Sequence, residues 1–187
     1  MPFKYYGGVH PDYAKTASKT PVRTISPPPV VVLPMIQQIG APNKPVVKVG
    51  DTVKMGQLIG SNDAPVSAPV HSSVSGKVIA VEPRRHMLGD MVMSVVIEND
   101  FQDTPCEDMK PLSEEQLKDP DAIIARIREA GVVGMGGAMF PTAFKIQGAR
   151  GKVDTVIING AECEPYLCGD HRTMLEHGEE LVVGVTI

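Results

Sequence analysis

The 187-residue chain has 18 Lys and Arg against 22 Asp and Glu, a net charge of −4. Nucleic-acid binding relies on clustered cations that displace phosphate counterions, so no nucleic-acid partner is expected. Three cysteines, an odd number, argue against a disulfide framework and for a reducing compartment. No apolar run approaches the roughly 20 residues of a membrane span, and no apolar signal core opens the chain, so membrane association would come through a partner.

The first stretch, residues 1–29, is expected to be an extended segment. It contains GGVHP, has little hydrophobic periodicity and ends in a triple proline, which favours extended backbone. Residues 30–104 hold short Val- and Ile-rich runs separated by turn sequences such as VGD at 49–51 and SND at 61–63. This pattern is typical of an all-β unit with short strands.

The third stretch, residues 105–187, begins with helix signals. Ser113 and Gln116 form a plausible capping box. Asp119 can cap a second helix over 120–130, with proline at its first position, three isoleucines on one face and Gly131 as its stop. A glycine-rich loop follows, and VDTVIIN at 153–159 predicts a buried strand.

The segment from about Asp170 is expected to be helical. It ends in the apolar run LVVGVTI without a capping residue, which suggests that the chain is a piece of a longer protein. The alternative is a naturally short chain whose last strand pairs elsewhere.

Two phrases in the β unit, KVGDTVKMGQLIG and SAPVHSSVSGKVIAV, resemble the biotinyl and lipoyl carrier domains. The resemblance implies a barrel-sandwich hybrid. Carrier chemistry needs a lysine on an exposed hairpin, and the sequence from Leu58 to Gly76 contains none, so a swinging-arm function is rejected. His71 in this stretch lacks companions at metal-ligand spacing and is expected to be an ordinary turn or surface residue.

The glycine-rich loop GMGGA follows a helix, so it is not the dinucleotide fingerprint, which follows a strand. Its backbone amides can approach a phosphate or a planar ring because no Cβ intervenes. Lys145, four residues beyond Pro141, could supply a positive charge. The alternative is a flexible turn.

A second polar cluster, Asn159, Glu162 and Glu164, follows the predicted strand. Ligands of α/β folds gather at strand C-termini, where carboxylates can accept hydrogen bonds from sugar hydroxyls. A helix begun near Pro141 could return the chain so that both loops converge on one pocket at the end of that strand. The alternative is a solvated acidic loop.

Together, GMGGAMFPTAFK and VIINGAECEPY resemble signatures of the NADH-binding flavoprotein subunit of respiratory complex I. With GGVHP, QQIGAPNKPVVKVGD and APVHSSVSG, the chain more closely resembles the C-subunit family of Rnf electron-transport complexes, over essentially its whole length. The resemblance implies a mixed fold, α+β or α/β. An N-terminal barrel-sandwich hybrid would precede a truncated Rossmann-like flavin- and NADH-binding domain.

The same resemblance implies the site residues. The glycine loop would line FMN, and Phe140 would lie near the nicotinamide nucleotide. Lys145, Asn159 and Glu162 would hold the flavin, and Glu164 would lie near the NADH ribose. The loop residues implied are Gly134, Gly136, Gly137 and Ala138. The sequence departs from the complex I pattern at Met135, where a basic residue is frequent, at Met139 and Ala143, where glycine is usual, and at Cys163, where complex I has glycine but cysteine suits the Rnf type.

The implied activity is electron input to a membrane-bound complex coupled to ion translocation. NADH would be oxidised, or NAD reduced, through FMN, and electrons would pass to [4Fe–4S] clusters. The chain has no closely spaced cysteine run for a cluster, so the clusters are expected beyond it, and this piece alone is expected to be inactive. The implied partners are other Rnf subunits, including a ferredoxin-like iron–sulfur subunit, at the cytoplasmic face of the membrane. The alternatives are a non-catalytic scaffold and a cobalamin-reductase-like flavoprotein.

Overall fold

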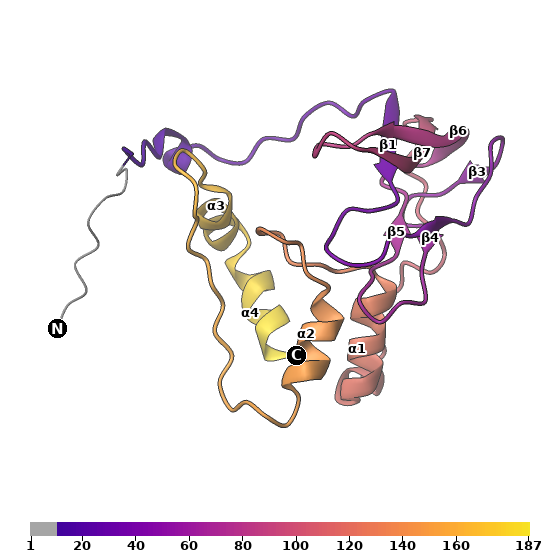
Figure 1. Ribbon diagram of the computed structural model, residues 1–187. Helices are drawn as coiled ribbons and strands as arrows, with labels where there is room; N and C mark the ends of the chain where they lie inside the picture. The colour runs from indigo at the N-terminus through magenta and orange to yellow at the C-terminus, as the bar shows by residue number, and fades with distance from the viewer. Residues whose placement is uncertain (1–10) are drawn as a thin grey trace. The chain divides into compact units, whose positions relative to one another are not determined.

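The computed structural model describes residues 11–187 (Figure 1). It divides into two compact units, each described by itself. One unit is Ser26–Asp154, and the other combines residues 11–25 with Thr155–Ile187. Most of the GGVHP motif lies outside the described residues. The expected extended segment contains a short 3-10 helix, η1 (Thr16–Lys19).

The larger unit contains two antiparallel sheets, which confirms the all-β prediction (Figure 1). The first has four strands in the order β1-β7-β6-β3, and the second has three in the order β2-β4-β5. The longest pairing joins β6 to β7 from Gly76 opposite Asn99 to Arg85 opposite Met91, with an irregularity between Val78 and Ala80. The strands are β1 (Val30–Pro34), β2 (Lys44–Pro45), β3 (Thr52–Val53), β4 (Leu58–Ser61), β5 (Val70–His71), β6 (Gly76–Arg85) and β7 (Met91–Asn99).

Branched aliphatic side chains from both sheets form one core. Ile59 of β4, Val78 of β6 and Val95 of β7 are completely buried. Because side chains alternate across a strand, β6 and β7 turn one face into this core. The core residues are Met35, Val53, Ile59, Val70, Val74, Val78, Val95 and Ile97.

Two glycines of this unit have positive φ but different surroundings. Gly50 of the VGD turn has φ +97° with open space around it. Gly76 begins β6 with φ +156°, and a Cβ there would lie 1.9 Å from the carbonyl oxygen of Glu98. Only glycine allows β6 and β7 to approach this closely, because any side chain would collide with backbone.

The helix signals after residue 105 are largely confirmed. Ser113 and Gln116 exchange the reciprocal capping bonds, at 3.0 and 3.2 Å, although they open only a 3-10 turn, η2 (Gln116–Lys118). The Asp119 side chain accepts from the Asp121 amide at 3.0 Å and caps α1 (Pro120–Glu129). Gly131 follows with φ +67°, as the left-handed end of a helix requires.

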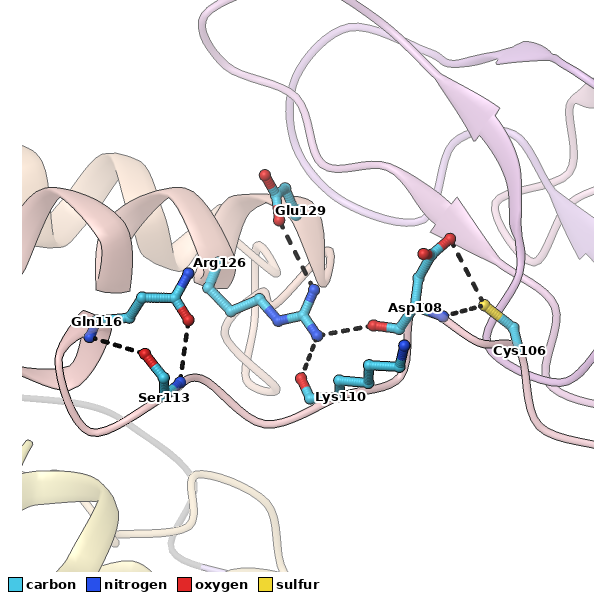
Figure 2. Close-up of polar contacts among 7 residues, drawn as sticks. All are labelled: Cys106, Asp108, Lys110, Ser113, Gln116, Arg126 and Glu129. Carbon is cyan, nitrogen blue, oxygen red and sulfur yellow. Dashed lines mark hydrogen bonds and ion pairs between the residues drawn. The ribbon is translucent and has the colours of Figure 1, made fainter.

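Arg126 of α1 holds the segment that connects the strands to the helices. Its guanidinium donates to the carbonyls of Asp108, at 2.8 Å, and of Lys110, and lies 3.7 Å from Glu129 (Figure 2). The Asp108 amide in turn donates to the Cys106 sulfur at 3.3 Å. Hydrogen bonds therefore help to order this connection.

The buried strand predicted for residues 153–159 is wrong. These residues belong to no strand, and Val156 and Ile157 are 71% and 84% exposed. A strand needs a neighbour for its backbone groups, and an apolar run cannot supply one by itself. All seven strands end by Asn99, so the mixed fold is of the α+β kind within residues 11–187.

The C-terminal helical prediction is confirmed, with a break at His177 between two helices. They are α3 (Gly169–Glu176) and α4 (Gly178–Thr186). Among residues 11–187, no helix has the length and apolar character needed to cross a membrane.

Candidate functional site

The glycine loop is the tip of a small hairpin. An isolated bridge pairs Val133 with Pro141, and the Gly134 amide donates to the Phe140 carbonyl at 2.9 Å. The chain then enters α2 (Thr142–Ala149), which confirms a helix beginning near Pro141. The Ile39 amide donates to the Ala138 carbonyl at 3.1 Å and ties the tip to the β unit.

The backbone amides at the tip of the hairpin are free to bind a ligand. A Cβ added to Gly136 or Gly137 would meet nothing within 4 Å, so this backbone faces open space. Within residues 11–187, no protein acceptor takes a hydrogen bond from the amides of residues 135–138. Successive free amides in a glycine loop attract anions. The loop therefore fits a phosphate or the anionic edge of a ring.

Lys145 supplies the positive charge expected beside this loop. Its Nζ lies 3.3 Å from the position that a Cβ of Gly134 would take, so the ammonium group and the loop backbone are adjacent. The lysine lies in the first turn of α2, where the helix dipole also favours an anion. The residues present thus fit the phosphate-bearing part of a flavin nucleotide.

Two departures from the family pattern have structural effects at this loop. Met139 has φ +50°, a conformation that side chains rarely adopt and glycine accepts readily. Ala143 is the buried residue of α2. Phe140 packs edge to face on Phe144, with the ring centroids 5.7 Å apart.

The acidic loop lies in the other unit. Two of its three predicted site residues use their side chains in hydrogen bonds to nearby backbone amides. The Asn159 side chain accepts from the Ala161 amide at 3.0 Å. Glu162 accepts from the Asp170 amide at 3.0 Å and thereby caps α3. Glu164 is exposed, and no side chain among residues 11–187 pairs with its carboxylate. The strand at whose end the pocket was predicted is absent, so that part of the prediction is wrong. The convergence of this loop with the glycine loop stays a prediction.

The sequence reasoning missed Lys15. Its Nζ lies 3.6 Å from the Glu162 carboxylate and donates to the carbonyls of Glu164, at 3.1 Å, and of Leu167. The Tyr166 amide also donates to the Tyr13 carbonyl at 2.8 Å. No local pattern signals a contact between residues almost 150 positions apart.

A wide groove of about 1090 Å³ lies elsewhere in the larger unit, among β4, β5, residues 106–112 and α1. His71 lines it at the end of β5, half-buried. Burial, and then the nearby Arg126 cation, lower the pKa of His71. Neither the glycine loop nor Lys145 lines this groove, so it is distinct from the candidate anion site.

The two antiparallel sheets of the larger unit form a barrel-sandwich hybrid, and the glycine loop follows them in the chain. The family described as "RnfC Barrel sandwich hybrid domain" matches residues 3–102, and "Nuo51 FMN-binding domain" matches residues 127–187. The chain therefore belongs to the RnfC family.

Relatives from three organisms carry matching names. The C-subunit of the Na⁺-translocating ferredoxin:NAD⁺ oxidoreductase complex of Acetobacterium woodii is 49% identical over 185 residues, 98% of this chain and 42% of the relative. The C-subunit of the proton-translocating ferredoxin:NAD⁺ oxidoreductase complex of Clostridium ljungdahlii is 45% identical, over 98% of this chain and 40% of the relative. The C-subunit of the ion-translocating oxidoreductase complex of Rhodobacter capsulatus is 42% identical, over 99% and 36%. The chain thus spans about two fifths of the length of these curated relatives.

Proposed function

We propose that this chain forms part of the electron-input subunit of an Rnf-type complex, in which NADH is oxidised, or NAD reduced, through FMN. The observation that carries the proposal is the glycine loop, whose free amides and neighbouring Lys145 form a site for an anionic group. The match to an FMN-binding domain over residues 127–187 supports flavin as the ligand. The names of the relatives support the reaction and its coupling to ion translocation.

Each group has a distinct task in this proposal. The amides of residues 135–138 and the Lys145 ammonium bind the anionic part of FMN and orient it. Asn159 and Glu162 would bind the flavin's hydroxyl groups, and Glu164 the ribose of NADH. The chemistry that FMN supplies when bound is exchange of an electron pair with a nicotinamide and of single electrons with iron–sulfur clusters. Those [4Fe–4S] clusters would lie in the part of the subunit beyond this chain.

The proposed setting is the cytoplasmic face of the membrane, held by other Rnf subunits and passing electrons to or from a ferredoxin-like iron–sulfur partner. The relatives' names, which describe subunits of ion-translocating complexes, support this setting. Without the iron–sulfur clusters, this chain alone would be inactive in electron transfer.

The test measures flavin content by absorption spectroscopy and NADH oxidation in the full-length subunit. Lys145→Ala should reduce flavin retention by about tenfold, as expected for loss of a charge-assisted contact. Lys152→Ala, just beyond the far end of α2, is the matched control and should retain flavin. Glu164→Ala should reduce NADH oxidation more than flavin retention. A wild-type protein that retains no flavin would contradict the proposal and favour a scaffold role.

A further inference from the structure

The N-terminal segment reaches the acidic loop through one side chain, Lys15. Its ammonium group makes three polar contacts there: the Glu162 carboxylate at 3.6 Å and the carbonyl oxygens of Glu164, at 3.1 Å, and Leu167. Two of these contacts are hydrogen bonds to backbone carbonyls, and the third is an ion pair. Lys15 therefore connects both arms of the loop between residues 162 and 167.

Further bonds hold the same segment against α3. The Arg172 guanidinium donates to the Ser18 carbonyl at 3.1 Å, and the Val22 amide donates to the Glu176 carboxylate at 3.0 Å. Glu176 is itself paired with Arg172, and this side-chain hydrogen bond, with the bond from Val22, lowers the pKa of Glu176. Lys15 is thus held by an anchored segment and can act as a fixed support for the loop.

The carboxylates of Glu162 and Glu164 differ in exposure and in hydrogen-bond partners. Glu162 is only 11% exposed in its side chain, and its two carboxylate oxygens face the Asp170 amide and Lys15. Glu164 contributes its carbonyl to Lys15, while its carboxylate remains exposed and without a side-chain partner among the described residues. The loop therefore presents one carboxylate outward and uses the other for its own structure.

We propose that Lys15 is a positioning residue that holds the loop so that the Glu164 carboxylate meets the hydroxyl groups of a nucleotide ribose. The inference rests on the proposed function, and it assigns to the N-terminal segment a part in binding the nicotinamide nucleotide. A carboxylate accepts hydrogen bonds from neighbouring hydroxyl groups. A loop that is already ordered binds more tightly because its ordering cost does not fall on the ligand.

The proposal predicts a selective effect. The Lys15 side chain is 29% exposed, so its ion pair is partly screened and contributes little to global stability. Removing it should loosen the loop without unfolding the unit. Glu164 would then lose its position, and affinity for the nucleotide should fall while flavin retention and melting temperature stay close to wild type.

The experiment uses the full-length subunit and NAD⁺ as the probe, with Kd measured by isothermal titration calorimetry. Lys15→Met should raise Kd on the order of tenfold, the scale of a lost hydrogen bond to a charged group. Lys15→Arg, which keeps the charge and several donors, should recover part of this loss. Lys19→Met is the matched control: Lys19 is exposed in η1, four positions away, and its substitution should leave Kd unchanged.

A double-mutant cycle with Glu164→Ala decides whether Lys15 acts through Glu164. If it does, Lys15→Met should add almost nothing to the loss caused by Glu164→Ala. Additive losses, an unchanged Kd in Lys15→Met, or a joint fall in melting temperature and flavin content without recovery in Lys15→Arg would overturn the inference. A wild-type subunit that binds neither FMN nor NAD⁺ would instead overturn the proposed function.

Discussion

The β unit and residues 155–187 contain similar apolar side chains and use them differently. In the β unit, Ile59, Val78 and Val95 are fully buried in one core. In residues 155–187 no residue is buried, and Ile157 is 84% exposed. Apolar composition alone therefore does not produce a core. A core also requires neighbouring segments that bring several apolar faces together, as the short strands of the two sheets do.

The largest expected effect separates the two regions directly. Ile59→Ala should lower the free energy of unfolding by about 3–4 kcal/mol, because it leaves a cavity in a closed core. Ile157→Ala should change it by less than about 0.5 kcal/mol in this chain, because the side chain is already in solvent. Urea unfolding followed by circular dichroism measures both. A large loss in Ile157→Ala would show that residue 157 is packed and would contradict the comparison.

The next effect concerns the close approach of β6 and β7. Gly76→Ala should destabilise the β unit by roughly 2–3 kcal/mol, because the added Cβ meets the Glu98 carbonyl and the backbone must move. Gly50→Ala, with a positive φ but open surroundings, is the matched control and should lose about 1 kcal/mol. Equal losses of stability at the two positions would mean that the positive φ, rather than the contact with β7, determines the destabilisation.

The smallest expected effect is an increase in stability. Met139→Gly should stabilise the larger unit by about 0.5 kcal/mol, because glycine accepts φ +50° without strain and this relief exceeds its greater loss of backbone entropy. Met135→Gly is the matched control in the same loop, since Met135 has no positive φ and should gain nothing. Thermal unfolding of the two variants beside wild type provides the measurement, and a loss in Met139→Gly would contradict the argument.

Sequence patterns predicted the parts of this fold whose signals are local. Ser113 with Gln116, Asp119 before Pro120, and the glycines of the tight turns act over a few residues, and each is found where it was expected. The strand at 153–159 failed because strand formation depends on a neighbour, which an apolar run does not reveal. Lys15 was missed for a related reason, since its contacts lie far away in the sequence.

At the candidate site, too, local signals were predictable and contacts between distant segments were not. The glycine loop and Lys145 are eleven or fewer residues apart, and the structure brings them together as predicted. The roles of Asn159, Glu162 and Glu164 depend on a ligand and on distant segments, and they remain predictions.

The loop between β4 and β5 has a mechanical consequence. In carrier domains, this part of the barrel bears the lysine and must travel between reaction centres. Here Asn62 donates to the Pro42 carbonyl at 2.6 Å, Ser67 to the Ala64 carbonyl at 2.7 Å, and Arg128 of α1 to the same Ala64 carbonyl at 3.1 Å. The loop is fastened to residue 42 and to α1, so it is not free to swing as a carrier arm must.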